Sequence, residues 1–185
     1  MAGGFCTGKS TLAARVFSEL KVAGLDYDLV QEQKRQLHKE FGQYTSILDR
    51  FYMVIKQLEA EARSTATDGF VTDYPLFHFH IHALQYADTE KERDKLAIVD
   101  LFKVGLETGK NYHLIVLAQN PLEIPFAVDG ARSSNAETAR RHHDLSVHFL
   151  ETHFKSKLLY VSGTLEERTK AVVDEVNKRR SEIRT

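Results

Sequence analysis

The stretch that decides the fold is GGFCTGKST, residues 3–11, and the apolar run LAARVFSEL follows it directly at 12–20. The pattern G-x-x-x-x-G-K-[ST] is filled without a gap by Gly3, Gly8, Lys9 and Ser10. Glycines at these positions let successive backbone N–H groups point at phosphate oxygens, and the following helix adds its positive end there. The stretch therefore predicts a phosphate-binding loop, with a chance glycine-rich turn that caps a helix as the alternative.

Within this loop, Lys9 is expected to reach the β and γ phosphates of a nucleotide, and the Ser10 hydroxyl to hold Mg²⁺. Cys6 is the only cysteine of the chain, so it forms no internal disulfide. It is either a small filler residue or a reactive thiol, and the first interpretation is preferred. The residues expected to contact the nucleotide are Gly3, Gly4, Phe5, Cys6, Thr7, Gly8, Lys9, Ser10 and Thr11.

Length and charge limit the remaining possibilities. The chain has 185 residues, which predicts one domain over 1–185 with a substantial core. Its 25 basic and 26 acidic residues nearly balance, which disfavours nucleic acid and anionic membranes as partners. No apolar run approaches 18 residues and no charged-then-apolar pattern occurs, so neither a membrane span nor a secretion signal is expected, and the expected location is the cytoplasm.

Strand-like apolar runs alternate with amphipathic helices along the chain. The strands are expected at 27–32, 70–72, 112–119 and 157–163, and this alternation is typical of an open, mostly parallel α/β sheet flanked by helices. Helices are expected after the loop, over 44–63, around 77–87 and 89–108, from the capping box at 134–137 to about 154, and after the capping box at 164–167. In the helix over 44–63, one face is expected to carry Ile47, Phe51, Val54, Ile55 and Leu58.

The phosphate-binding loop has no complete strand before it. Met1 and Ala2 are too few residues to cross a sheet at about 3.3 Å per residue. In open α/β sheets the strand before such a loop is central and buried on both faces. Two explanations are open. Either the first strand is truncated, because the natural protein begins earlier or its start codon is misassigned, or Met1 and Ala2 are the stump of an unusually short strand.

Two carboxylates follow predicted strands, at the sheet edge where open α/β sheets bind ligands. Asp73 is the candidate partner of Mg²⁺, directly or through water, because a bound metal needs acidic oxygen ligands. Glu32 could accept the proton of a substrate hydroxyl. For each, the alternative is a carboxylate that caps the next helix or pairs with a surface lysine. Asp28 and Asp68 precede their apolar runs and are weaker candidates.

The segment PFAVDGARSSNAETARRHHD, residues 125–144, predicts a lid over about 120–141. Arg132 in the loop and Arg140 near the start of the next helix are the candidates that neutralise charge on the transferred group and help to exclude water. Arg141 is a third candidate. The alternative is that some of these arginines form surface pairs with acidic residues on neighbouring helical turns.

Three histidines alternate in FHFHIHA, at positions 78, 80 and 82. Alternate spacing on a strand would bring them together, but a segment that follows Pro75 is expected to begin a helix, where such side chains point apart. No cysteine or acidic partner lies at zinc-like spacing. A metal site is the alternative to partly buried helix residues, and the second is preferred.

Several of these segments together resemble a known family. GGFCTGKSTLA, Glu32, FGQYTSILDRFYMVIKQLEAEA, VTDYPL and GARSSNAETARRHHDLSVHFL occur in an order that resembles small P-loop ATPases and kinases often found in phage genomes, grouped with the NadR-type AAA domain, the nicotinamide ribonucleoside kinase domain. The resemblance spans nearly the whole chain. It implies a three-layer P-loop kinase fold in one domain, with ATP and Mg²⁺ as cofactors.

The resemblance also implies roles for single residues. Asp73 matches the acidic residue after the third strand, and Arg132 with Arg140 matches the lid arginines. Position 74 departs from the pattern, because related deoxynucleoside kinases carry an arginine where this chain has Tyr74. Residues 43 and 44, a glutamine and a tyrosine, could contact a base or a nicotinamide ring, or else begin a solvent-facing helix.

Three functions are compatible with these features. The preferred one is a kinase that transfers the γ-phosphate of ATP to a small nucleoside-like or nucleotide-like hydroxyl. The second is a nucleotide-dependent switch or ATPase without a small acceptor. A GTPase is disfavoured because no N-K-x-D motif follows 112–119, and a AAA+ motor because the chain lacks room for a helical lid domain. The third is a 5′-kinase of DNA or RNA, against which the balanced charge argues.

Overall fold

The computed structural model describes residues 1–4, 7–33, 37, 47, 49–118 and 136–183. Within these ranges, short strands alternate with helices, as the sequence predicts. The strands are β1 (Tyr27–Val30), β2 (Gly69–Thr72), β3 (Ile115–Ala118) and β4 (Leu158–Val161). The helices are α1 (Lys9–Val22), α3 (Asp49–Ala62), α4 (Phe77–Tyr86), α5 (Glu92–Gly109), α6 (Ala136–His153), the 3-10 helix η1 (Lys155–Lys157) and α7 (Leu165–Ile183).

The strands form two parallel pairs, β1 with β2 and β3 with β4. Met1 and Ala2 lie between the pairs. The Met1 amine donates a hydrogen bond to the Thr72 carbonyl of β2 at 2.6 Å, and the Ala2 N–H donates to the Val116 carbonyl of β3 at 2.7 Å. Ala2 also forms a parallel bridge with Leu117. The two residues before the loop therefore stand where the sequence predicts a central strand.

A cavity of about 430 Å³ separates the two strand pairs along the rest of their facing edges. Met1 lies at this cavity, which is also lined by residues of β2 and β3 and by apolar side chains of the flanking helices, including Val16 of α1 and Val172 of α7. The sheet is therefore two half-sheets that meet across a hollow, and they are joined by hydrogen bonds at Met1 and Ala2.

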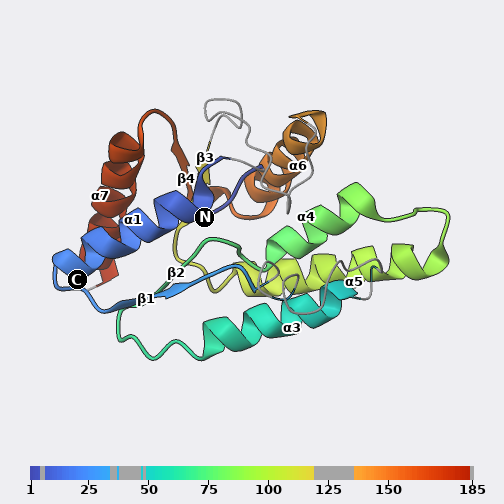
Figure 1. Cartoon of the computed structure of the whole chain (residues 1–185), viewed down its shortest axis with the longest axis horizontal. Helices are drawn as coiled ribbons and strands as arrows, with labels where there is room; N and C mark the ends of the chain where they lie inside the picture. Colours follow the sequence, from blue (N-terminus) through green and yellow to red (C-terminus); the bar gives the residue numbers. More distant parts are fainter. Residues whose placement is uncertain (5–6, 34–36, 38–46, 48, 119–135, 184–185) are drawn as a thin grey trace.

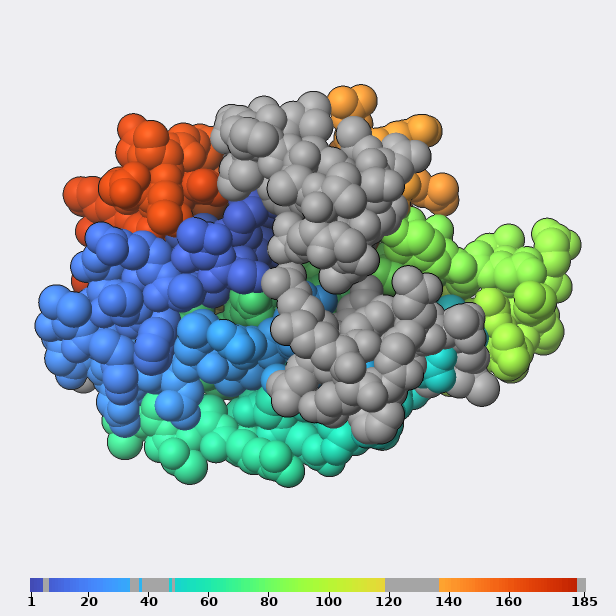
Figure 2. Space-filling model, viewed as in Figure 1, coloured from blue at the N-terminus to red at the C-terminus, as the bar shows by residue number. Residues whose placement is uncertain are grey.

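Helices cover both faces of the strands, which gives the expected three layers. Figure 1 shows α1 and α7 together on one side and α4, α5 and α6 on the other. The two faces of β3 follow this arrangement, because Val116 packs in a core with α1 and α7, whereas Ile115 and Leu117 pack in a core with α4 and α6. In the space-filling view, α1 in blue lies against α7 in red (Figure 2). None of the described helices is both long and apolar enough to cross a membrane.

The helix starts agree with the sequence signals. α1 begins after Gly8, whose φ of 74° lies in the left-handed region that favours glycine. Before α7, the predicted capping box forms: the Thr164 N–H donates to Glu167 Oε2 at 2.8 Å, and the Glu167 N–H donates to Thr164 Oγ1 at 3.2 Å. The capping residues predicted for α6 lie outside the described residues, but α6 itself is present.

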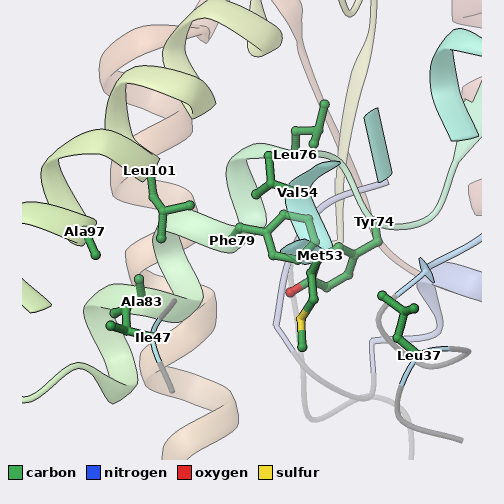
Figure 3. Packing of buried hydrophobic residues seen from close by; sticks show 10 residues of the cluster. All are labelled: Leu37, Ile47, Met53, Val54, Tyr74, Leu76, Phe79, Ala83, Ala97 and Leu101. Carbon is green, nitrogen blue, oxygen red and sulfur yellow. The ribbon is translucent and has the colours of Figure 1, made fainter. Parts of the chain in front are cut away.

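The buried face of α3 differs from the prediction. Ile55 and Leu58 were expected on this face, yet they are exposed at 52% and 39%. Val54 is buried as predicted, and the other buried residues of the helix are Met53 and Gln57. Met53 and Val54 point toward residues of β2's end and of α4 (Figure 3). The helix is therefore rotated relative to the prediction, and a glutamine lies in its buried stripe.

Candidate active site

The phosphate-binding loop is held by its glycines and by a distant arginine. Gly3 has a φ of 118°, a conformation that side chains rarely adopt, so this position suits glycine. Thr7 is buried, and its hydroxyl donates to the Gly4 carbonyl at 3.1 Å. Arg168 of α7 donates from Nη1 to the Thr7 carbonyl at 3.2 Å. The loop is thus fixed from the side of α7.

Lys9 begins α1, and its side chain lies over the loop. Its Nζ donates to the Gly4 carbonyl at 2.6 Å and to the Gly3 carbonyl at 3.2 Å. Ser10 and Thr11 are exposed in the first turn of α1, where the helix end favours anions. Phe5 and Cys6 of the predicted site lie outside the described residues. The described part of the loop therefore has the features of a phosphate site.

Asp73 follows β2 directly and lies beside the start of the loop. Burial lowers the pKa of the Met1 amine to about 5; the Asp73 carboxylate opposes this shift and the Lys9 ammonium adds to it. The charges of Asp73 and Lys9 thus both act on the Met1 amine.

The Asp73 side chain suits a metal ion. Asp73 is 7% exposed, and none of the described residues makes a hydrogen bond to its Oδ1. A buried carboxylate oxygen without a protein partner is a fitting ligand for Mg²⁺ or for a metal-bound water.

Glu32 lies two residues beyond β1, which ends at Val30, and is half-buried. Burial raises the pKa of the Tyr74 hydroxyl above its ordinary value, and the Glu32 carboxylate adds to the rise. Glu32 therefore lies near Tyr74, the residue after Asp73. The structure brings both predicted carboxylates to the same end of the neighbouring strands β1 and β2.

The structure describes only two of the three arginines predicted for the lid. Arg132 lies outside the described residues, as do residues 43 and 44, the suggested ring contacts. Arg140 and Arg141 are exposed on α6. The same helix reaches the loop through a different side chain, because His143 Nδ1 accepts a hydrogen bond from the Gly4 N–H at 3.4 Å.

The alternating histidines lie in α4, as the sequence analysis preferred. His78 and His80 are buried. Desolvation by burial lowers the pKa of His78 well below its usual value, with smaller contributions from His142 and Lys9, so the His78 ring is neutral. It packs edge-on against Tyr74, with ring centroids 5.0 Å apart.

Sequence reasoning missed two residues at this site. Arg168 gives no signal of its own, because an arginine in the first turn of a helix is ordinary, and only the fold brings it to the loop. Gln57 had a signal, since Met53, Gln57 and Glu61 recur every four residues in α3. Because residues 57 and 61 are polar, this regular spacing was not recognised as the buried face of the helix.

Comparisons with known proteins agree with this geometry. A family described as AAA domain matches residues 1–168. No curated protein matches the chain. Among solved structures, the NadR protein in complex with NR has a TM-score of 0.70 and 19% sequence identity, covering 95% of this chain and 50% of that chain. This chain thus spans half the length of the NadR chain.

A second solved structure is similar over its whole length. Deoxyadenosine kinase from M. mycoides, with the products dCMP and a flexible dCDP bound, has a TM-score of 0.57 and 13% identity, covering 96% of this chain and 97% of that chain. Both likenesses concern the fold. With the matched family, the loop at 3–11 and the three layers, they show that this chain belongs to the AAA domain family and has a P-loop kinase-like fold.

Proposed function

We propose that this protein is an ATP-dependent kinase that transfers the γ-phosphate of ATP to the hydroxyl of a small nucleoside-like or nucleotide-like acceptor. The observation that carries the proposal is the convergence of the loop with two carboxylates. Val30 of β1 and Thr72 of β2 are paired in parallel, so Glu32 and Asp73 both follow the same end of these strands. Hydrogen bonds from Met1 to Thr72 and from Ala2 to Val116 place the start of the loop beside that end. Phosphoryl transfer needs this combination of phosphate cradle, metal ligand and proton acceptor.

Each group has a distinct role in the proposal. Lys9 and the loop amides bind the β and γ phosphates. Ser10 and Asp73 hold Mg²⁺, which neutralises charge on the phosphates when bound. Glu32 accepts the proton of the acceptor hydroxyl while its oxygen bonds to the γ-phosphorus, the bond from that phosphorus to the bridging oxygen breaks, and ADP leaves. A lid over 120–141, with Arg132 and Arg140, excludes water from this transfer.

Two observations support this acceptor class, the ligands of the two similar structures and the balanced charge of the chain. The two similar structures carry NR in one case and dCMP with dCDP in the other. These ligands share a sugar attached to a ring, so the proposed acceptor is of this kind. Because the chain has 25 basic and 26 acidic residues, a long nucleic acid is the less suitable acceptor.

The direct test measures ADP release from ATP and Mg²⁺ with a panel of acceptors: nicotinamide riboside, deoxyadenosine, deoxycytidine, dCMP and a 5′-hydroxyl oligonucleotide. We expect one of the nucleosides or the nucleotide to raise ADP release above the basal rate. An increase with the oligonucleotide alone would favour a polynucleotide kinase. An unchanged basal rate across the panel would contradict a kinase and favour the nucleotide-dependent switch.

Lys9→Ala tests the phosphate site itself. A ligand that binds only the folded state stabilises it, by about 2.7 kcal/mol at a concentration one hundred times the dissociation constant. We expect the ATP-dependent rise in melting temperature to be lost in Lys9→Ala. Arg15→Ala is the matched control, because Arg15 is an exposed cation of the same helix that pairs with Glu19 at 3.0 Å. An undiminished shift in Lys9→Ala would place the nucleotide elsewhere.

A further inference from the structure

Gln57 is a completely buried polar residue in the middle of α3. Its exposed fraction is 0%, and its neighbours in the buried stripe are Met53 and Val54. A buried amide whose hydrogen bonds are unmade costs about 1–3 kcal/mol, so a glutamine in such a place depends on its partners. Its partners therefore indicate what the residue does.

The two ends of the Gln57 amide reach two different strands. Gln57 Oε1 accepts a hydrogen bond from the Gln33 N–H at 3.1 Å, and Nε2 lies 3.4 Å from Thr72 Oγ1 as its donor. The orientation of the amide is fixed, because a backbone N–H can only donate and must face the oxygen. Gln33 is the residue after Glu32, and Thr72 is the residue before Asp73.

Thr72 extends this connection around Asp73. Its hydroxyl oxygen also accepts a hydrogen bond from the Tyr74 N–H at 3.3 Å, so the residues on both sides of Asp73 are tied to one oxygen atom. Thr72 is 6% exposed. The hydrogen bonds that hold the Asp73 backbone thus lead directly to Gln57 and through it to the segment that carries Glu32.

A second, half-buried partner anchors the amide. Gln57 Nε2 lies 3.4 Å from Glu61 Oε1, and the Tyr112 hydroxyl donates to the same oxygen at 3.0 Å. That hydroxyl accepts from the Leu76 N–H at 3.0 Å. The amide is therefore one member of a buried network, and it cannot rotate away without breaking several bonds.

We propose that Gln57 is a positioning residue, which sets the relative placement of Glu32 and Asp73 by bridging the backbone after one and the side chain before the other. This inference rests on the proposed function and extends it. Neither carboxylate is touched by Gln57, so its effect passes through Gln33 and Thr72. Groups that orient metal ligands in this indirect way typically change metal affinity or activity by 10–100-fold.

The test uses two substitutions that keep shape and remove polarity. Gln57→Met keeps the length of the side chain, and Thr72→Val keeps its β-branched form in the strand. Thr72→Ser retains the hydroxyl and is the conservative variant. Gln85→Met is the matched control, because Gln85 also donates from a glutamine amide, to the Thr138 carbonyl at 2.7 Å, but between α4 and α6.

The first readout does not need the acceptor. The melting temperature is followed with ATP while Mg²⁺ is titrated, and with ATP and EDTA. In Gln57→Met and Thr72→Val, we expect the Mg²⁺ concentration for half of the metal-dependent shift to rise about tenfold or more. Thr72→Ser and Gln85→Met should match the unsubstituted protein. Unchanged Mg²⁺ dependence in Gln57→Met and Thr72→Val, or no metal-dependent shift in the unsubstituted protein, would overturn the proposal.

The second readout separates this inference from the proposed function. With an acceptor from the panel, kcat should fall about 10- to 100-fold in Gln57→Met and Thr72→Val, while the KM for ATP changes little, because the loop is untouched. Substituting both residues should cost less than the sum of the two single substitutions, since the two side chains share one hydrogen bond. If no panel member is phosphorylated but the Mg²⁺ shift behaves as expected, the kinase proposal fails and the positioning role of Gln57 toward Asp73 stands.

Discussion

Glu61→Gln is expected to remove a large part of the pH dependence of stability. Glu61 lies in the buried network of α3, where it accepts hydrogen bonds from Tyr112 and Gln57. Desolvation by burial raises its pKa from 4.5 to about 7, against the opposing effect of these two hydrogen bonds. The folded protein therefore binds the Glu61 proton more tightly than the unfolded chain does.

The sign of the effect follows from this difference. Between pH 4.5 and about 7, the folded state holds the proton and the unfolded state has released it, so the free energy of unfolding falls as pH rises. One pKa unit corresponds to about 1.4 kcal/mol, so the whole shift corresponds to about 3 kcal/mol. This contribution is fully present below pH 4.5 and is lost above pH 7.

Urea unfolding followed by circular dichroism at pH 4.5, 6 and 8 measures the effect. Between the extremes, the unsubstituted protein should lose about 3 kcal/mol more than Glu61→Gln does. Glu59→Gln is the control, because Glu59 is exposed on the same helix and its pKa is lowered by a hydrogen bond with Lys56. Parallel pH curves for the unsubstituted protein and Glu61→Gln would refute the reasoning.

Three further substitutions test other parts of the structure. Arg168→Leu should weaken ATP binding by about tenfold in calorimetric titration, because it removes a charged hydrogen bond to the Thr7 carbonyl. Binding equal to that of the unsubstituted protein would show that Arg168 does not support the phosphate-binding loop. Thr164→Ala should lower the free energy of unfolding in urea by about 1 kcal/mol through loss of the capping box, and Thr164→Ser should restore it. Gly109→Ala should cost about 1–3 kcal/mol in the same assay, because its Cβ would lie 2.3 Å from Phe154 Cζ; a neutral result would mean that the ring moves aside freely.

The sequence predicts most of the fold, because local patterns set most of it. The loop, the helix start at Lys9 and the capping box at Thr164 depend on residues close in sequence, and all three are confirmed. The strands are shorter than predicted, since β1 ends at Val30 instead of residue 32 and β3 begins at Ile115 instead of residue 112. Apolar residues continue beyond those that pair with a neighbouring strand, so hydrophobicity alone overestimates the length of a strand.

The candidate site is predictable only in part. Glu32 and Asp73 could be found because strand ends meet at one edge of a parallel sheet. Arg168 could not, since its contact depends on the approach of α7 to the loop, and the spacing that marks Gln57 was overlooked because the residue is polar. Ile55 and Leu58 were wrongly predicted to be buried in α3 because they are apolar. Apolar residues on an exposed helix face are common in folded proteins.

The hollow between the half-sheets bears on how the protein unfolds. Cooperative unfolding requires that each part of a structure loses its support when its neighbour opens, and a continuous ladder of hydrogen bonds across a sheet provides that support. Here the ladder is interrupted between β2 and β3, and the loop leaves the seam at Ala2. The core under α1 and α7 still joins the two halves, because Val71 of β2 and Val116 of β3 both pack in it. We therefore expect one unfolding transition, in which the seam at Ala2 opens first. A triphosphate bound to the loop would hold the seam closed and raise the midpoint of that transition.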